Sequence, residues 1–155
     1  MNLDTNAADR LSALTERLQR LEDLDEIRQL YIDYGRYLDA GDPDAYASLF
    51  ARDAKLRLGP VMRADGRENI RQAAAATIQP KPGHSTRSVH VFGSPSVELA
   101  GDAATGECVW AAIGESQNGS TTVLVGRHMD DLIREDGHWR IARRRGLIDV
   151  GSIGS

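Results

Sequence analysis

Asp39 is an acidic residue without an evident structural role, which makes it a candidate for chemistry. It lies in the segment RYLDAGDPDAYASLF, three positions before a second acid, Asp42. Asp42 directly precedes Pro43 and is well placed to cap a short helix with its side chain. Asp39 instead comes at the end of the preceding helical pattern, where the helix dipole disfavours a negative charge. A functional role for Asp39 is therefore favoured over a structural one.

His90 and Arg144 are the next candidates. An imidazole can accept and return a proton near neutral pH, which suits His90 to general acid–base catalysis. Taken alone, however, His90 fits a structural histidine on a half-buried strand better. Arg144 is the middle residue of a run of three arginines, and strand alternation directs it to the opposite face from Arg143 and Arg145. An arginine that faces a cavity would bind a carboxylate or a developing oxyanion, but which of the three does so stays open.

The remaining histidines and the single cysteine are weaker candidates for a functional role. We expect His84, His128 and His138 to be surface or structural residues. No spacing of histidines, cysteines and acids matches a metal site, so we expect no metal and no cofactor. Cys108 is the only cysteine of the chain, which excludes a disulfide framework, and we expect it to be a small buried side chain.

Length and charge limit the class of protein. A chain of 155 residues corresponds to one domain, and its net charge of -4 is made of interspersed acids and bases. No basic stripe favours nucleic acid as a partner, and neither a membrane span nor a secretory signal is evident. Lysine occurs only at Lys55 and Lys81 among nineteen basic residues, a bias that we attribute to genome composition. We expect a bacterial, cytoplasmic protein.

The first third of the chain is helical in pattern. Leucines at spacings of three and four mark residues 8–22, and the pattern continues to Leu38. This predicts one long helix, or two helices with a joint near residues 23–25, ended by Gly41 in the left-handed conformation. Asp42 then begins a short helix, for which the expected buried face consists of Tyr46, Leu49 and Phe50.

The rest of the chain is mostly strand-like. A strand is predicted over residues 54–58, a helix over 66–78 and a loop at Pro80, Pro82 and Gly83. Long strands follow, separated by turns at 101–102, 115–120 and 136–137. We place these strands at 88–99, 103–114, 121–135 and 138–150.

This order of elements predicts an α+β fold. We expect a single domain over residues 1–155, with a core at about 20–150, an N-terminal helical extension at 8–22, and frayed ends before about residue 8 and after Val150. The helices should pack on a strongly curved antiparallel or mixed sheet of four to six strands. Aromatic residues make up only 5% of the chain, which is consistent with a cone whose interior is incompletely filled and forms a pocket.

Three segments of this sequence resemble a known superfamily. They are EIRQLYIDYGRYLDAGDPDAYASLFARDA (26–54), STRSVHVFGSPSVEL (85–99) and GRHMDDLIREDGHWRIARR (126–144). They are similar to nuclear-transport-factor-2-like proteins, and within these to the SnoaL-like branch that includes bile acid 7α-dehydratase, scytalone dehydratase and hexachlorocyclohexane dehydrochlorinase. The resemblance covers about residues 20–150 and implies the cone-shaped fold. It says less about the reaction, because the superfamily also contains isomerases, hydrolases and proteins without catalysis.

The resemblance implies roles for four residues. In the dehydratase and dehydrochlorinase branch, an acid at the end of the first main helix orients a strand histidine, and Asp39 and His90 match these two. Tyr34 matches a tyrosine of the bile acid enzyme, and Arg144 matches an arginine of the dehydrochlorinase pocket. A further acid or second histidine of those enzymes, on the strand around residues 108–112, has no counterpart in this sequence. We also expect four residues to contact substrate: Trp110, Tyr31, Phe50 and Cys108.

An Asp39–His90 pair predicts proton-transfer chemistry. A carboxylate holds a neutral imidazole in one tautomer and stabilises the imidazolium that forms when the ring takes a proton. The leading hypothesis is therefore a cofactor-independent lyase, dehydratase-like, or isomerase for a small hydrophobic ring compound such as a steroid, terpenoid, polyketide or aromatic. The alternatives are a non-catalytic small-molecule-binding module and an epoxide-hydrolase-like enzyme. We expect a homo-oligomer, either dimer or trimer, because apolar residues occupy both faces of the strands.

Overall fold

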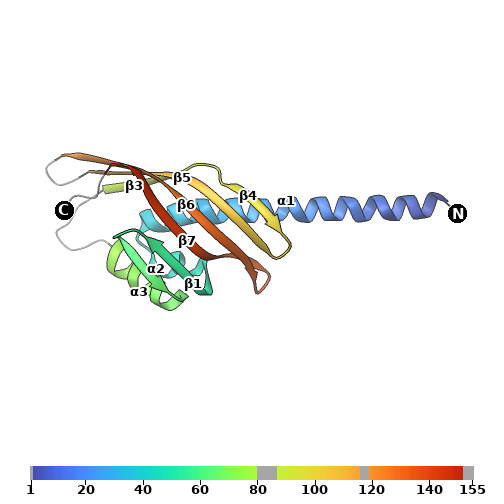
Figure 1. Ribbon diagram of the computed structural model, residues 1–155, viewed down its shortest axis with the longest axis horizontal. Coiled ribbons are helices and arrows are strands. Elements are labelled where there is room, and N and C mark those ends of the chain that lie inside the picture. Colours follow the sequence, from blue (N-terminus) through green and yellow to red (C-terminus); the bar gives the residue numbers. More distant parts are fainter. Residues whose placement is uncertain (1, 80–86, 116–118, 152–155) are drawn as a thin grey trace.

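One long helix and one curved sheet dominate the molecule (Figure 1). The computed structural model describes residues 2–79, 87–115 and 119–151. Helix α1 (Asn2–Ala40) crosses the sheet and continues well beyond it towards the N-terminus. Helices α2 (Pro43–Ser48) and α3 (Arg67–Ile78) pack against each other beside the first two strands. Within the described part of the chain, no helix combines the length and apolar character needed to span a membrane.

The sheet is mixed and has seven strands in the described residues. Its order is β2-β1-β7-β6-β5-β3, and β4 also pairs with β5. Every pairing is antiparallel except that of β1 with β7, which is parallel. The strands are β1 (Phe50–Leu58), β2 (Met62–Asp65), β3 (Arg87–Phe92), β4 (Ser96–Ala100), β5 (Ala103–Glu115), β6 (Thr121–Glu135) and β7 (His138–Val150).

The predicted α+β architecture is confirmed, with helices packed on a curved mixed sheet. The predicted number of strands was too low, because the expected strand at 88–99 divides at Gly93 into β3 and β4, and because the short β2 was missed. Helix α1 is continuous through residues 23–25, and it begins at Asn2 and not near residue 8. The predicted loop at residues 80–83, His84 and most of the 115–120 turn lie outside the described residues.

The turns around the two shorter helices follow from local sequence. Gly41 adopts a φ of 64°, as expected after the C-terminus of α1. Asp42 caps α2, since its carboxylate accepts hydrogen bonds from the backbone N–H groups of Asp44 and Ala45. Phe50, expected on the face of this helix, instead begins β1 because α2 ends at Ser48.

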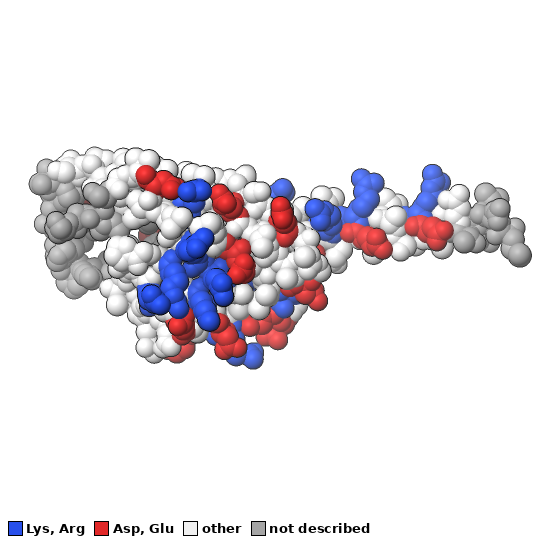
Figure 2. Space-filling model, in the orientation of Figure 1, with Lys and Arg blue, Asp and Glu red and all other residues white. Residues whose placement is uncertain are grey.

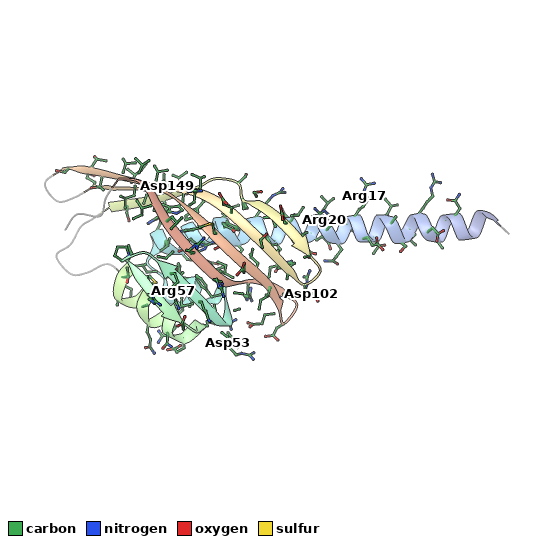
Figure 3. The ribbon with its side chains drawn as sticks, in the orientation of Figure 1. Arg17, Arg20, Asp53, Arg57, Asp102 and Asp149 are labelled. Atoms are coloured by element: carbon green, nitrogen blue, oxygen red, sulfur yellow. The ribbon has the colours of Figure 1, made fainter. Side chains whose placement is uncertain are left out.

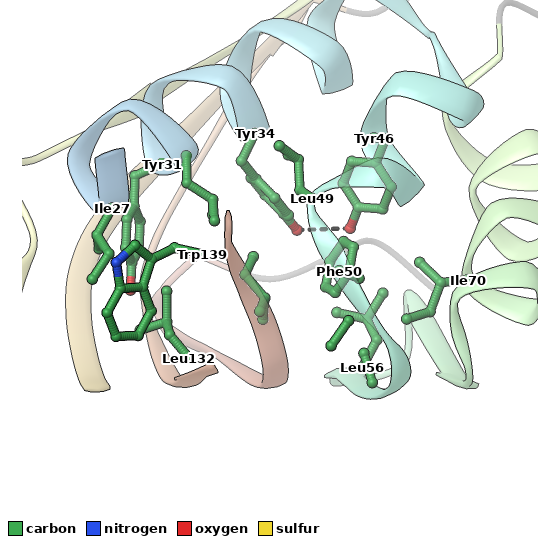
Figure 4. Close-up of a cluster of buried hydrophobic side chains, with 14 of the residues drawn as sticks. Ile27, Tyr31, Tyr34, Tyr46, Leu49, Phe50, Leu56, Ile70, Leu132 and Trp139 are labelled. Carbon is green, nitrogen blue, oxygen red and sulfur yellow. Dashed lines mark hydrogen bonds between the residues drawn. The ribbon is translucent and has the colours of Figure 1, made fainter. Parts of the chain in front are cut away.

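The core lies between the inner half of α1 and the concave face of the sheet (Figure 4). Ile27, Tyr31 and Tyr34 of α1 are almost completely buried. From the strands they meet Leu132 and Trp139. Burial of each such side chain stabilises the fold by roughly 1.5–3 kcal/mol. These contacts fix the C-terminal half of α1, and with it the position of Asp39.

Small residues on β5 allow α1 to lie close to the sheet. Ala104, Gly106 and Cys108 face the helix in alternation. A Cβ at Gly106 would lie 2.4 Å from the hydroxyl oxygen of Tyr31, so a larger residue there would force the Tyr31 side chain to move. The next inward residue, Trp110, is large and lines the open space beyond this contact.

Candidate active site

A cavity opens at the end of α1. It measures about 920 Å³ and lies between the last turn of α1, strand β3, the β1–β2 turn and the ends of β5–β7. Its wall is largely apolar, with aliphatic side chains that include Leu38, Leu58, Val61, Met62, Ile78, Leu124, Leu147 and Ile148. Among the described lining residues, only Asp39, His90, His128 and Tyr34 have titratable side chains. The chemistry of the cavity rests on these four.

Asp39 and His90 are in direct contact at the mouth of the cavity. The Nδ1 atom of His90 lies 2.7 Å from Oδ1 of Asp39. The backbone N–H of His90 also donates to the same carboxylate, at 3.1 Å to Oδ2 and 3.2 Å to Oδ1. The end of α1 and strand β3 thus hold the two residues next to each other. The carboxylate of Asp39 accepts hydrogen bonds from both the ring and the backbone of His90.

This arrangement selects one tautomer of His90. A carboxylate accepts hydrogen bonds, so Nδ1 of His90 carries the proton that Asp39 receives. The lone pair of the neutral ring is then on Nε2, the nitrogen away from Asp39. Because His90 lines the cavity, a bare Nε2 is available as a base.

His128 is a second histidine in the cavity wall, and only 4% of it is exposed. Its ring packs among Tyr34, Phe92 and Trp110, with ring centroids 5.5–5.7 Å apart. Burial, the positive charge of Arg144 and the nearby His90 lower the pKa of His128 well below its usual range. His128 is therefore neutral at physiological pH.

His128 was expected to be a surface or structural residue, and the structure places it, buried, in the cavity wall. His128 alternates with Asp130 and Leu132 in β6, and all three are buried, so His128 lies on the inner face of the sheet. Nδ1 of His128 is enclosed and has no hydrogen-bond partner among the described residues. Nε2 is the ring nitrogen left to meet a ligand, since it lies on the side of Gly146, which also lines the cavity.

Tyr34 forms the inner end of the cavity. Its hydroxyl group lies 2.9 Å from that of Tyr46, a contact that also appears in Figure 4. Burial raises the pKa of Tyr34, so the phenol stays protonated. Tyr34 and Asp39 line the same cavity although they are five residues apart on α1, because they meet it near the end of the helix.

Arg144 is fully buried, but it is not among the described residues that line the cavity. Its Nε and Nη2 atoms donate to Asp130 at 2.8 and 2.6 Å, across the β6–β7 pair. Its guanidinium also lies 4.1 Å from the ring centre of Tyr34. Arg143 and Arg145 are exposed on the other face, as alternation predicts. The structure therefore places Arg144 behind the cavity wall, because Asp130 holds it there.

Three other predicted substrate contacts are also core residues. Tyr31 donates a hydrogen bond to Asp130, and Phe50 packs against Tyr46 with ring centres 5.3 Å apart. The thiol of Cys108 donates to the carbonyl oxygen of Gly93, and burial raises its pKa to about 11. None of the three is among the described lining residues.

Trp110 is the predicted substrate contact that the structure does place on the cavity wall. Its indole lies over Gly126, where a Cβ would come within 2.6 Å of the ring. For metals, the described residues contain no group of three histidine, cysteine or acidic side chains close enough to hold an ion.

Comparison with known proteins places this site in a family. Residues 19–145 match the SnoaL-like domain. The chain belongs to the SnoaL-like family. This agrees with the resemblance noted in the sequence, and the α1–β3 position of Asp39 and His90 lies inside the matched region. No curated protein matches the chain in sequence.

Several solved structures share the fold of this chain. An NTF2-like protein with a cystatin-like fold from Novosphingobium aromaticivorans is 29% identical, with a TM-score of 0.75 and coverage of 92% of both chains. A candidate scytalone dehydratase from the same species is 21% identical, with a TM-score of 0.74 and coverage of 86% of this chain and 88% of that one. A hexachlorocyclohexane dehydrochlorinase (LinA type 3) from Novosphingobium barchaimii is 18% identical, with a TM-score of 0.75 and coverage of 88% and 92%.

Proposed function

We propose that this SnoaL-like protein is a cofactor-independent lyase or isomerase, in which Asp39 and His90 form the general base. The observation that carries this proposal is the 2.7 Å contact of the two side chains at the mouth of a largely apolar cavity. An ion pair that only stabilised the fold would not have to line a cavity. A cavity that only bound a ligand would not have to contain a base. The combination supports proton abstraction from a bound molecule.

The reaction follows from the tautomer of His90. Nε2 of His90 removes a proton from a carbon next to a carbonyl group, and Asp39 stabilises the imidazolium that results. In a lyase, the electron pair of the broken C–H bond forms a C=C bond as the bond to a β-hydroxyl group breaks, and the imidazolium protonates the departing hydroxide to give water. In an isomerase, the imidazolium returns the proton to another carbon.

His128 is proposed to bind the carbonyl oxygen of the substrate. As a neutral imidazole with an enclosed Nδ1, it can donate a hydrogen bond from Nε2 to the oxygen on which negative charge develops. A hydrogen-bond donor held in place by the protein stabilises such an oxyanion. Because His128 is neutral, no charged side chain has to be removed from water to form the site. Tyr34, also kept protonated by burial, lies next to His128 with ring centres 5.5 Å apart and supports the same end of the substrate.

The cavity favours a hydrophobic ring compound as substrate. Its volume of about 920 Å³ is within the range of sites for drug-sized molecules. Phe92 and Trp110 offer flat aromatic surfaces beside His128. A steroid, terpenoid, polyketide or aromatic ring with a carbonyl and a β-hydroxyl group fits both the walls and the chemistry.

The two alternatives have less support. A binding module without catalysis gives no reason for the Asp39–His90 contact. An epoxide hydrolase of the type considered needs two acids and an arginine around a water molecule. In the described lining, Asp39 is the one carboxylate, and Arg144 is engaged with Asp130 behind the wall. The dehydrochlorinase among the structural relatives is named for an elimination, which is in keeping with the lyase proposal.

The proposal is tested with a panel of cyclic β-hydroxy ketones, assayed for loss of water and, in D₂O, for exchange of the proton next to the carbonyl. The wild-type protein should turn over or exchange at least one ring class. His90→Ala should abolish this activity, and Asp39→Asn should reduce it by about 10²–10⁴-fold, as expected for a positioned acid–base group. Both variants should still bind the ring compound.

A matched control is available in the same chain. His138 also lies near an acid, with Nδ1 3.3 Å from Glu26, but the pair is exposed and outside the cavity. His138→Ala should leave turnover unchanged. Equal loss in the His90 and His138 variants, or ring binding without any turnover or exchange in the wild type, would favour the binding-module alternative.

We further propose that the outer face of the sheet is covered by another copy of the chain. Large apolar side chains are exposed there in neighbouring strands, including Val89, Val91, Val109, Ile113 and Val123. Exposed apolar patches of this kind mark association surfaces. Light scattering should give the mass of a dimer or trimer at micromolar concentration, and a monomer would contradict this part of the proposal.

A further inference from the structure

The outer part of α1 has no partner within the described chain. Residues 6–22 are exposed on every side, and the helix extends beyond the sheet as a free rod (Figure 1). Four leucines lie along it, each more than half exposed: Leu11, Leu14, Leu18 and Leu21. An isolated helix of this length has only marginal stability in water. We therefore expect the exposed leucine stripe to pack against a partner.

The leucine stripe does not face the body of its own molecule. At about 100° per residue, its direction is roughly half a turn away from that of Ile27, Leu30, Tyr31 and Tyr34, which pack on the sheet. The sequence pattern predicts one continuous face along the whole helix, but α1 carries two faces in succession. The body occupies one side of the helix, and the leucines point to the other.

The spacing of the leucines is that of a coiled coil. The intervals are three, four and three residues, which places Leu11 and Leu18 at a positions and Leu14 and Leu21 at d positions of a heptad repeat. The next a and d positions are Asp25 and Arg28, so the seam ends close to Asp23, where α1 becomes buried against the body. The apolar seam therefore coincides with the free part of the helix.

We propose that residues 6–22 pair in parallel with the same segment of a second copy of this chain. Because the body lies on the side of α1 opposite the seam, two bodies can flank such a pair without meeting at it. Each leucine that the pair buries leaves water, which favours association. Helix pairing is thus a contact between copies separate from the outer face of the sheet.

Charges beside the seam select the parallel orientation. Arg17 occupies a g position and Glu22 the e position of the following heptad, the two positions that meet across a parallel pair. In an antiparallel pair with the leucines in register, Leu11 meets Leu21 of the other copy. Arg17 then faces Arg17 of that copy, and the like charges repel. Arg17 and Arg20 project freely from the rod in Figure 3.

The polar side of the segment does not favour a membrane as the partner. Residues 6–22 contain three arginines and three acids, and the two signs are interspersed along the rod (Figure 2). Helices that bind anionic membrane surfaces carry an excess of basic residues on the polar face. A second copy of the chain buries the leucines and also pairs the charges beside them. A membrane surface would bury only the leucines.

Single cysteines in the full-length chain test the proposal by disulfide formation under mild oxidation. Leu21→Cys puts the thiol at a d position, where it meets its counterpart in a parallel pair. In an antiparallel pair it lies about 15 Å away along the axis, because ten residues at about 1.5 Å each separate positions 11 and 21. Glu16→Cys, at the outward f position, is the control. Cys108 is the only native cysteine, and its burial and raised pKa keep it out of the reaction.

The parallel pair predicts a covalent dimer for Leu21→Cys in about tenfold or greater yield over Glu16→Cys. Adding Leu14→Glu and Leu18→Glu to the Leu21→Cys chain should lower the yield by about tenfold or more, since four charges then enter the seam. Equal yields for Leu21→Cys and Glu16→Cys, or no product from either, overturn the proposal. A product formed only when Leu11→Cys and Leu21→Cys chains are mixed also overturns it, in favour of an antiparallel pair. Crosslinking that requires added lipid vesicles assigns the leucines to a membrane instead.

Discussion

Two ion-pair sites lie a few strands apart in this protein and have opposite environments. Asp39 and His90 meet at 2.7 Å at the mouth of the cavity, with side chains 29% and 24% exposed. Asp130 and Arg144 meet at 2.6 and 2.8 Å behind the cavity wall, and both side chains are sealed from solvent. Each site joins one carboxylate to one nitrogen base. Access to the cavity is what separates them.

Their chemistry differs accordingly. His90 uses its Nδ1 atom for the contact with Asp39, and that contact leaves Nε2 unengaged. Arg144 keeps its proton under all physiological conditions, and its engaged donors point to Asp130. The first site is suited to proton transfer and the second to holding β6, β7 and α1 together. An acid and a base in a family-matching position therefore do not identify a site until their access to the cavity is known.

The largest expected effect on stability comes from breaking the buried pair. Arg144→Met removes the guanidinium and leaves Asp130 charged and enclosed, so the free energy of unfolding should fall by about 3–5 kcal/mol. For a chain of this size, each 1 kcal/mol corresponds to roughly 2–4 °C in the thermal midpoint. His90→Ala, the equivalent change at the exposed pair, should cost less than about 1 kcal/mol. Chemical denaturation of the two variants measures both values. Similar losses of unfolding free energy would contradict the view that only the buried pair is structural.

A smaller effect is expected from the third member of the buried cluster. Tyr31 donates a hydrogen bond to Asp130, and Tyr31→Phe removes that donor while keeping the ring. Hydrogen bonds to charged groups contribute about 1.5–3 kcal/mol, and we expect a loss of unfolding free energy in that range. Tyr37→Phe provides a control on the same helix, since its ring is only partly buried. A loss no greater than that of the control would mean that Asp130 is satisfied by Arg144 alone.

The pH dependence of stability tests the buried neutral state of His128. Its pKa is lowered in the folded protein, so below about pH 6.5 the unfolded chain binds a proton that the folded chain does not. Stability should therefore fall as the pH drops below this value, by up to about 1.4 kcal/mol per pH unit. His128→Gln should remove this part of the slope while stability near pH 8 changes less. Parallel pH profiles for the wild-type and variant proteins would show that His128 is not held neutral.

The sequence was a good guide to local structure. The caps and turns could be read directly, because Asp42, Pro43 and Gly41 act on the backbone within a few residues: Asp42 through its side-chain cap, and Pro43 and Gly41 through their own φ angles. The order of helices and long strands followed from hydrophobic periodicity, which depends on short-range spacing. The division of one strand at Gly93 and the short β2 were missed, because pairing with distant strands decides where a strand ends.

The site was only partly readable from the sequence. Asp39 and His90 lie 51 positions apart, and the resemblance to a family, not the periodicity, brought them together. Alternation separated Arg144 from Arg143 and Arg145, but nothing in the sequence indicated that Asp130 on the neighbouring strand would hold Arg144 behind the wall. For the same reason the sequence could not place His128 in the cavity wall, since alternation indicates which face a residue occupies and not whether that face is filled by α1 or left open. The depth of a cavity is a property of packing between elements.

The state of the His90 ring tests the central claim most directly, and it can be measured without a known substrate. Nitrogen NMR of protein labelled in its histidine rings distinguishes the two neutral tautomers, and the His90→Ala variant assigns the signal. We predict that neutral His90 carries its proton on Nδ1 with Nε2 bare, and that Asp39→Asn shifts this tautomer population while the fold is retained. A neutral His90 protonated on Nε2, or a tautomer unaffected by Asp39→Asn, would contradict the proposal that Asp39 prepares His90 as the base.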